Sequence, residues 1–494
     1  MFEITCLLTY VKRGTSGPTL VRSTALDPVP PQIGHGIGPA AYAGGQLASG
    51  VAPPEHAYAG LSVPVAEPPP AGEMAAQDHE IADAIAQGGD WMTELLTRLV
   101  EKDTTLGREE TGQAVVREAL SELGLEPVDV PMDAAALRAH PAASPFDWEV
   151  ADKRNVVATW SPASGFGGLS LILNGHIDVV SPEPRSHWAR DPFTAHVEGG
   201  WLYGRGAADM KCGLAAILGA VKGLRALGLS PRAPVSIQSV VEEECTGNGA
   251  LQTVLAGYAA DAAIIAEPFG AAITTSQVGV LWFDIVVQGL PGHAAENGTM
   301  VSAIESSLPL IQALRAVEAE LNASPPPPYD QYEHPISLNV GQIHAGDWNS
   351  TVPGECVTGY RIAMYPGTPV ADIRARVERA VADAAAAQPG AFATPPEVRY
   401  RGFAAEGYQV PPDHLLVQSL SSTYARHLGA SPALVATTGT TDARVLGAAG
   451  GIPTVCFGPY AEGAHGVGER VYLPSVIQTA QVMGLFIKDW CGVT

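Results

Sequence analysis

Short apolar runs alternate with amphipathic stretches along most of this 494-residue chain, and this alternation constrains the fold more than any other feature. Runs typical of buried strands and runs with helical spacing occur at residues 156–160, 169–174, 214–227, 235–241, 249–255 and 262–266. Strands that are interleaved with helices in this way are typical of a layered sheet. The sequence therefore predicts an α/β fold.

The order of the predicted elements changes near residue 275. A strand, a helix, two strands and a second helix follow at residues 279–288, 301–321, 337–344, 356–364 and 371–387. The α/β pattern then resumes with a helix, a strand and a last helix at residues 415–427, 455–457 and 474–491. We therefore expect a small α+β domain at residues 275–395, inserted into a larger domain made of residues 78–274 and 396–494.

The N-terminal part of the chain has a different composition. Residues 1–77 are rich in Pro, Gly and Ala and show no sustained period of 2 or 3.6. This composition predicts a mostly disordered extension, or a segment outside the functional unit. Helical spacing begins after it, over residues 82–100 with an interruption at 88–89, and again over residues 110–123.

The charge of the chain limits its partners. It carries 28 Lys and Arg residues against 51 Asp and Glu residues, a formal net charge of −23. This acidity disfavours nucleic acid and anionic membranes as partners, and no run reaches the roughly 18 apolar residues of a membrane-spanning helix. The first apolar stretch precedes the first basic residues, which is the reverse of a secretory signal, and the six cysteines are scattered. We therefore expect a cytoplasmic protein.

Five segments place His, Asp or Glu at the end of a predicted strand or on a glycine-rich loop. The candidate residues are His176 with Asp178, Asp209, the triplet Glu242 to Glu244, Glu267 and His465. Sites of open α/β sheets form at the carboxyl ends of the strands, so these side chains are expected to meet there. Each segment alone has an ordinary explanation, because a single His is usually structural and a Glu triplet is usually a solvated surface. Their joint occurrence in this context favours a functional site.

Two His and three carboxylates form a ligand set that suits zinc, with cobalt or manganese as alternatives. A carboxylate that bridges two ions would hold them ~3.5–4 Å apart, and such a pair lowers the pKa of a bridging water and polarises a carbonyl group. One further carboxylate must then take the proton of the water and pass it to the leaving group. The candidate residues supply five ligands and one unligated Glu.

In their order and spacing, the five segments resemble the co-catalytic zinc deacylase and exopeptidase family. This family includes acetylornithine deacetylase, succinyl-diaminopimelate desuccinylase, bacterial glutamate carboxypeptidase and aminoacylase. The resemblance covers roughly residues 80–494, and the N-terminal extension has no counterpart in it. It implies a zinc-peptidase-like catalytic domain with a mixed sheet flanked by helices, an inserted α+β lid and dimerisation domain, two divalent metal ions and a homodimer.

The resemblance also implies a role for each candidate ligand. His176 and Glu267 would bind one zinc, Glu244 and His465 would bind the second, and Asp209 would bridge both.

The same resemblance implies that Asp178 orients His176 and that Glu243 is the general acid/base. A register shifted by one residue stays open, with Glu242 as the base and Glu243 as the ligand. The family further implies a cis peptide bond after the bridging Asp, between residues 209 and 210.

Four further residues are implied to act on the substrate. Residues 289–295 match the stretch that supplies a His to the active site of the partner subunit, so His293 would stabilise the oxyanion of the tetrahedral intermediate. Asn349 and Arg361 resemble lid residues that bind the substrate carboxylate, a task that suits a planar guanidinium group. A surface ion pair is an equal alternative for Arg361. Thr440 resembles a residue that contacts the substrate from a turn of the catalytic domain.

Two departures from the family pattern concern the identity of the substrate. Gly359 stands two residues before Arg361, where the family usually has Asp, and Phe269 follows the Glu-Pro pair, where Thr is frequent.

We therefore predict a metal-dependent hydrolase that cleaves the amide bond of an N-acyl amino acid or a similar small substrate with a carboxylate, as a deacetylase or desuccinylase does. Glu243 would be the general base for a water activated by two metals. A dipeptidase or carboxypeptidase of the same family is one alternative, and a non-catalytic protein that binds metal or ligand is another.

Overall fold

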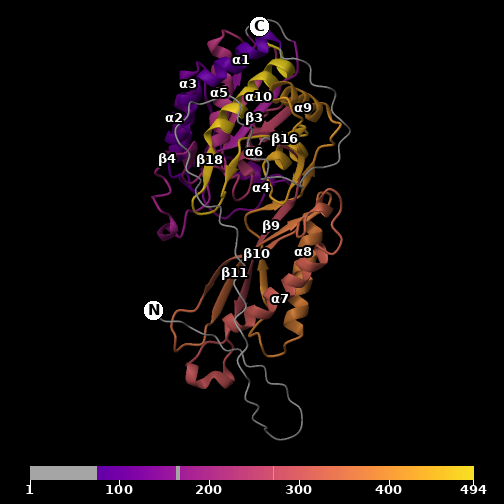
Figure 1. Cartoon of the computed structure of the whole chain (residues 1–494). Coiled ribbons are helices and arrows are strands. Elements are labelled where there is room, and N and C mark those ends of the chain that lie inside the picture. The colour runs from indigo at the N-terminus through magenta and orange to yellow at the C-terminus, as the bar shows by residue number, and fades with distance from the viewer. Residues whose placement is uncertain (1–74, 163–166, 271) are drawn as a thin grey trace, which may run out of the picture. The chain divides into compact units, whose positions relative to one another are not determined.

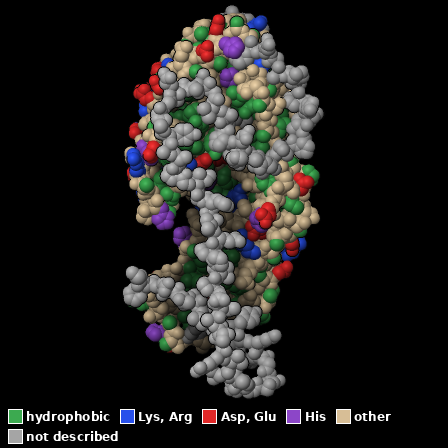
Figure 2. Space-filling model, in the orientation of Figure 1, with side chains coloured by type: hydrophobic (Ala, Val, Ile, Leu, Met, Phe, Trp, Pro, Cys, Tyr) green, Lys and Arg blue, Asp and Glu red, His purple; other side chains and the backbone are tan. Residues whose placement is uncertain are grey.

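The computed structural model describes residues 75–162, 167–270 and 272–494 (Figure 1). The extension predicted at residues 1–77 lies outside these ranges, apart from the start of the first helix at Ala76. Within the described ranges, no helix is both long and apolar enough to cross a membrane. On the face drawn in Figure 2, Lys and Arg side chains are few and lie scattered among Asp and Glu side chains.

The largest sheet of the described residues has nine strands of mixed direction, in the order β1-β2-β6-β3-β7-β16-β8-β14, with β15 paired to β8. Its strands are β1 (Val128–Pro131), β2 (Arg154–Trp160), β3 (Leu171–His176), β6 (Val235–Val240), β7 (Ala262–Ile265), β8 (Ile273–Gln277), β14 (Tyr408–Gln409), β15 (Leu434–Thr437) and β16 (Thr454–Cys456). The central strands β6, β3, β7 and β16 run parallel to one another. Their carboxyl ends therefore lie at one edge of the sheet, which is where sites form in such sheets.

Helices cover this sheet. They are α1 (Ala76–Gln87), α2 (Gly89–Val100), α3 (Glu110–Glu122), α4 (Ala134–Ala139), α5 (Lys211–Ala226), α6 (Asn248–Leu255), α9 (Leu415–Leu428) and α10 (Leu473–Cys491). Helix α5 is buried along most of its length, because it packs between β3 and the helices α1, α2 and α10 (Figure 1). Small residues permit this close packing: a Cβ atom on Gly213 would lie 2.1 Å from the carbonyl oxygen of Ala266. The predicted mixed sheet flanked by helices is confirmed.

A second sheet of five strands has its own core. It has the order β10-β11-β9-β12, with β13 paired to β9. Its elements are β9 (Gly279–Gln288), α7 (Ala303–Leu321), β10 (Leu338–Ala345), β11 (Glu355–Met364), α8 (Val370–Ala386), β12 (Glu397–Arg399) and β13 (Ala404–Ala405). Alternate residues of β9, from Leu281 to Val287, are buried in a core with side chains of α7 and α8. This period of 2 is expected for a sheet with helices on one face.

The second sheet continues past residue 395, where the sequence predicts the end of the inserted domain, because β12 and β13 still pair with β9. The chain passes between the two sheets at two places. On the way out only Val278 separates β8 from β9. On the way back, β13 pairs with β9 and β14 pairs with β8, so the two crossings lie side by side.

A third sheet, of four short strands, was not predicted. It has the order β17-β18-β5-β4 and consists of β4 (His196–Glu198), β5 (Trp201–Tyr203), β17 (Ala461–Glu462) and β18 (Arg470–Tyr472). Strands of two or three residues are too short to produce a hydrophobic period that a sequence can reveal. This sheet pairs β5 with β18, so it brings the chain around Asp209 close to the chain around His465.

The longer elements agree with the sequence prediction. The interrupted helix at residues 82–100 is two helices, α1 and α2, that meet at Gly88. Short helical turns lie at Arg185–His187, Ala294–Thr299, Tyr329–Gln331 and Val445–Ala449.

Candidate metal centre

The candidate metal ligands come from the carboxyl ends of neighbouring parallel strands. His176 is the last residue of β3, the Glu triplet begins two residues after β6, and Glu267 follows two residues after β7. Because β6 and β7 are the two parallel neighbours of β3, the three segments meet at one edge of the sheet. Asp209 lies on the loop between β5 and α5, and His465 lies on the loop between β17 and β18.

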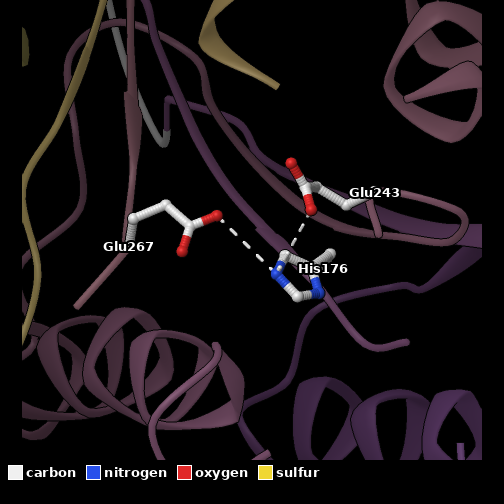
Figure 3. A group of neighbouring side chains, drawn as sticks. All are labelled: His176, Glu243 and Glu267. Carbon is white, nitrogen blue, oxygen red and sulfur yellow. Dashed lines mark ion pairs between the residues drawn. The ribbon is translucent and has the colours of Figure 1, made fainter. Parts of the chain in front are cut away.

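The imidazole of His176 lies at the centre of one group of carboxylates. Its Nε2 atom is 3.0 Å from Asp209 Oδ1, 3.6 Å from Glu267 Oε1 and 3.8 Å from Glu243 Oε2. Figure 3 shows Glu243 and Glu267 reaching this nitrogen from two sides. All these side chains except Asp209 are buried.

The imidazole of His465 lies at the centre of a second group. Its Nε2 atom is 3.0 Å from Glu244 Oε2 and 3.3 Å from Asp209 Oδ2. The two oxygens of Asp209 therefore face two different imidazoles. This is the arrangement that a bridging carboxylate needs.

Two sets of side chains bring ligand atoms within 4.8 Å of one another: His176 with Glu243 and Glu267, and His176 with Asp209 and Glu244. These sets differ from the division implied by the family, which puts Glu244 with His465. Glu244 also lies 3.0 Å from His465, and the nearest carboxylates to His176 Nε2 are those of Asp209 and Glu267.

The charges of this cluster fit divalent cations. Burial raises the pKa of Glu243 well above its usual value, and burial followed by the charge of Asp209 does the same for Glu267. One oxygen each of Glu243 and Glu244 is buried without a hydrogen-bond partner among the described residues. Unpartnered buried carboxylate oxygens next to imidazoles are costly unless a cation binds them. The donor set, imidazole nitrogen and carboxylate oxygen, is the one that zinc, cobalt and manganese accept.

The two imidazoles hold protons in the metal-free protein. Burial would lower the pKa of His176, but its hydrogen bond to Asp209 and the charge of Glu267 raise that pKa well above its usual value. The charge of Glu244 is the largest cause of a raised pKa in His465, and together with Asp209 it brings that pKa to about 11 despite burial. Protonated imidazoles thus provide positive charge where a metal would provide it.

The directions of the side chains in the Glu triplet bear on which glutamate could be the base. Glu242 has a positive φ of 63°, and its carboxylate accepts hydrogen bonds from Trp148 Nε1 and Thr246 Oγ1 at 2.7 and 2.9 Å. It also lies 2.8 Å from Lys153 Nζ. Glu242 thus faces away from the imidazoles, so the shifted register, with Glu242 as the base, does not fit this geometry.

Asp178 contacts His176 through its backbone rather than its side chain. The carbonyl oxygen of Asp178 lies 2.9 Å from His176 Nδ1, whereas its carboxylate lies 3.7 Å away. The carboxylate instead accepts hydrogen bonds from the backbone N–H groups of Glu243 and Glu244, at 3.2 and 3.0 Å. Asp178 therefore positions both the imidazole and the loop that carries the two glutamates.

Sequence reasoning missed the ion pair that joins the two metal-site loops. Arg205 Nη1 donates to Glu469 Oε2, and both side chains are buried. Glu469 Oε1 accepts from the backbone N–H of Asp209 at 3.0 Å, and Arg205 Nη2 donates to the carbonyl oxygen of His465 at 3.2 Å. Arg205 and Glu469 lie in the same glycine-rich segments as Asp209 and His465. The only signal in the sequence was that each charged residue stands next to a glycine in these segments.

Other buried polar groups near the site were also missed. Lys211 donates to the carbonyl oxygens of Leu99 and Lys102, at 2.9 Å each, and burial lowers its pKa to about 7. Asp442 is fully buried, and neither of its carboxylate oxygens has a hydrogen-bond partner among the described residues. The peptide bond between Asp209 and Met210 is cis, as the resemblance implies.

A cavity of about 930 Å³ opens over the cluster. Glu243, Glu244, Glu267, Asp209 and His465 line its floor, and β9, β10 and β11 of the second sheet supply other walls. Two predicted substrate residues, Arg361 and Thr440, line the cavity, and the hydroxyl of Thr440 is buried without a partner among the described residues. His293 and Asn349 are exposed and do not line it, so their roles stay predictions.

An α/β sheet with imidazoles and carboxylates gathered at one edge beneath a large cavity is the architecture of an enzyme site. The model of peptidase family M20/M25/M40 matches residues 172–489, and the chain belongs to this family. The predicted relationship to the deacylase and exopeptidase family is thereby confirmed, and the chain is an amide-hydrolysing enzyme.

Two curated relatives illustrate the range of the family. The chain is 32% identical to N-formyl-4-amino-5-aminomethyl-2-methylpyrimidine deformylase of Halalkalibacterium halodurans over 70% of this chain and 84% of the relative. It is 31% identical to acetylornithine deacetylase of Erwinia tasmaniensis over 53% of this chain and 67% of the relative. Among solved structures, the dipeptidase Dug1p of Saccharomyces cerevisiae has the same fold, with a TM-score of 0.69 and 14% identity over 85% of this chain and 99% of that one.

Proposed function

We propose that this enzyme is a dinuclear metal-dependent amidohydrolase that removes the acyl group from an N-acyl amino acid or a similar small amide. The observation that carries the proposal is the position of Asp209, whose two carboxylate oxygens lie 3.0 and 3.3 Å from the imidazole nitrogens of His176 and His465. A carboxylate in that position can hold two cations side by side.

The ligands of the first ion would be His176, Asp209 and Glu267, and those of the second would be His465, Asp209 and Glu244. The donor set suits zinc, with cobalt or manganese as alternatives. When bound, such ions polarise an amide carbonyl and lower the pKa of a water molecule.

Glu243 is the general base and acid of the proposal. It lies in the cluster with one oxygen free of hydrogen bonds among the described residues. Its carboxylate takes a proton from water as the water oxygen bonds to the amide carbonyl carbon. The carbon–nitrogen bond then breaks, Glu243 passes the proton to the leaving nitrogen, and the products are a carboxylic acid and an amine.

Arg361 and Thr440 would bind the substrate. Arg361 lines the cavity, and its guanidinium group donates to Ser337 Oγ at 2.9 Å and has no carboxylate partner among the described residues. A guanidinium group without an internal anion is suited to a substrate carboxylate. Thr440 offers an unpartnered hydroxyl to a polar atom of the substrate.

Replacing Glu243 tests the chemistry. Glu243→Gln keeps the size of the side chain but cannot take a proton, so turnover of N-acetyl amino acids should fall by about 10²–10⁴-fold. Metal content, measured by elemental analysis, should stay near two ions per chain. Glu118→Gln, at an exposed position on α3, is the matched control and should keep wild-type turnover. An equally active Glu243→Gln enzyme refutes the role.

The proposal includes a homodimer in which His293 and Asn349 serve the site of the partner subunit. Large apolar side chains are exposed on the second sheet and its surroundings: Leu308 by 52%, Ile343 by 53% and Trp348 by 72%. Exposed apolar side chains of this size are typical of subunit interfaces.

Mixing two inactive variants tests this arrangement. In a dimer of His293→Ala with Glu243→Gln, one site would have both its own Glu243 and an intact His293 from the other subunit. Random exchange of equal amounts should then restore about a quarter of the wild-type activity, because half of the dimers are mixed and each has one complete site. Native mass spectrometry confirms exchange, and exchange without recovered activity contradicts the shared site.

A dipeptidase would use the same cluster, and a cavity of about 930 Å³ is large enough for a dipeptide. A panel of N-acetyl amino acids against dipeptides of the same residues separates the two functions by their kcat/KM values.

A further inference from the structure

Among the described residues, one face of the second sheet carries no helix and faces the cavity. Helices α7 and α8 pack against Phe283 and Tyr360 on the other face. Because side chains of a strand alternate between faces, Trp282 and Arg361 point to the free side. Both residues line the cavity, as do their neighbours Phe283 and Tyr360. The register makes them direct partners: Trp282 lies opposite Arg361, and Arg361 lies opposite Asn339 on the next strand. The indole of Trp282 and the guanidinium group of Arg361 are thus cross-strand neighbours on the same face of the sheet.

The indole of Trp282 is part of an aromatic wall that reaches the metal cluster. The ring centroids of Trp282 and Phe403 are 5.2 Å apart in an edge-to-face arrangement. A Cβ atom on Gly402 would lie 2.5 Å from the Trp282 ring and 3.3 Å from the carbonyl oxygen of Cys245, the residue after Glu244. Trp148, whose indole donates to Glu242, lines the same cavity.

Arg361 is a half-buried cation that has no carboxylate partner among the described residues. Its hydrogen bonds go to Ser337 Oγ at 2.9 Å and to the carbonyl oxygen of Thr438 at 3.5 Å. Gly359, its neighbour on the same face of β11, supplies no side chain. The adjacent carboxylate, Asp284, lies 2.6 Å from Arg401 Nε, so it is already paired.

The other described carboxylates of the cavity belong to the metal cluster: Asp209, Glu243, Glu244 and Glu267. A cationic side chain of a substrate would therefore find no free carboxylate on the described walls. A planar apolar side chain would find the half-buried indole of Trp282, which Phe403 supports from behind, and it would be desolvated there.

We propose that the amine part of the substrate is an aromatic amino acid, with its ring against Trp282 and its carboxylate on Arg361. This inference rests on the proposed amidohydrolase function and adds the class of the amino acid to it. Cross-strand neighbours lie ~5 Å apart, and a ring and a carboxylate of one aromatic amino acid can reach both.

Substrate preference tests the inference. N-acetyl-L-tryptophan and N-acetyl-L-phenylalanine should be hydrolysed by the metal-loaded enzyme with kcat/KM values at least about tenfold above those of N-acetyl-L-alanine and N-acetyl-L-ornithine. In Trp282→Ala the ratio of the kcat/KM values for the phenylalanine and alanine substrates should fall at least about fivefold, and Trp282→Phe should retain most of it. The ratio does not depend on the fraction of folded enzyme, so partial unfolding of a variant cannot imitate the effect.

Trp91→Ala is the matched control, because Trp91 lies on α2 outside the cavity and donates to Glu122. Its ratio should equal that of the wild type. Hydrolysis with no preference for aromatic substrates, or with a preference for N-acetyl-L-ornithine, overturns the inference and leaves the amidohydrolase function standing.

Binding of the product amino acids tests the aromatic subsite when none of the four substrates is hydrolysed. Calorimetry should give a Kd for L-phenylalanine at least about tenfold below that for L-alanine, with the difference lost in Trp282→Ala. An enzyme that hydrolyses none of the four substrates but binds in this way keeps the aromatic subsite and loses the proposed function. Equal binding of the two amino acids overturns the subsite.

Discussion

Replacing Lys153 should destabilise the catalytic part of the chain strongly. Lys153 Nζ lies 2.7 Å from Glu109 Oε1 and 2.8 Å from Glu242 Oε1, and the three side chains are exposed by only 6%, 3% and 0%. Lys153→Met fills a similar volume but leaves two carboxylates buried without their cation. Breaking a buried pair in this way costs about 3–5 kcal/mol, because the remaining charges stay desolvated.

Thermal melting of the metal-loaded enzyme measures the effect. At about 2 °C per kcal/mol for a domain of this size, the melting temperature should fall by about 6–10 °C. Arg98→Met is the matched control, since Arg98 pairs with Glu118 at the surface, where the two side chains are exposed by 34% and 69%. Exposed pairs contribute about 0–1 kcal/mol, so the control should melt within about 2 °C of the wild type.

A triple variant completes the test. Glu109→Gln and Glu242→Gln, added to Lys153→Met, remove the uncompensated charges and should recover part of the lost stability. A Lys153→Met enzyme that melts with the control refutes the reasoning, because the carboxylates would then be solvated or protonated at little cost.

Three further predictions follow from the metal centre. His176 and His465 hold protons in the metal-free protein because their pKa values are raised. Zinc binds neutral imidazole, so zinc binding near pH 7 should release at least about two protons per chain and should tighten as pH rises. Calorimetry in two buffers measures the number of protons released, and a number near zero contradicts the prediction. Glu469→Ala removes the acceptor that holds the backbone of Asp209, so zinc affinity in competition with a chelator should fall about 10–100-fold. Glu462→Ala in the same segment should not change that affinity. Gly213→Ala places a Cβ atom 2.1 Å from a backbone carbonyl oxygen. Overpacking of this kind costs about 1–3 kcal/mol, so the melting temperature should fall by about 2–6 °C. An unchanged melting temperature contradicts the close contact.

Local patterns were sufficient for much of the fold. The long helices and central strands have apolar side chains at periods that their own segment reveals, so α5, β3 and β6 could be predicted from the sequence. The residues that we propose as metal ligands could be located for a related reason. Each stands directly at the end of such a strand or within a glycine-rich segment, so the strand prediction also located the side chain.

The supporting contacts could not be predicted because they join distant segments. Arg205 and Glu469 are 264 residues apart in the chain, and Lys153 lies 44 residues from Glu109. A charged residue in a sequence is assumed to be solvated unless something nearby suggests otherwise, and nothing near Lys153 or Glu469 identifies its partner. The direction of the Glu242 side chain could not be predicted either, because adjacent glutamates in a turn differ only in their backbone angles.

The two chain crossings between the sheets lie side by side, and this has a consequence for the length of substrate that the enzyme can accept. Both connections pass through one narrow ribbon, with Val278 on one strand and the turn between β13 and β14 on the other. Two short connections that lie side by side form a hinge about which the two halves can rotate. Arg361 lies on one side of this axis and Glu243 on the other. In the proposed mechanism, rotation about the ribbon would change the span between the carboxylate on Arg361 and the carbonyl group beside Glu243, so a molecule of the wrong length would be bound without being aligned for hydrolysis.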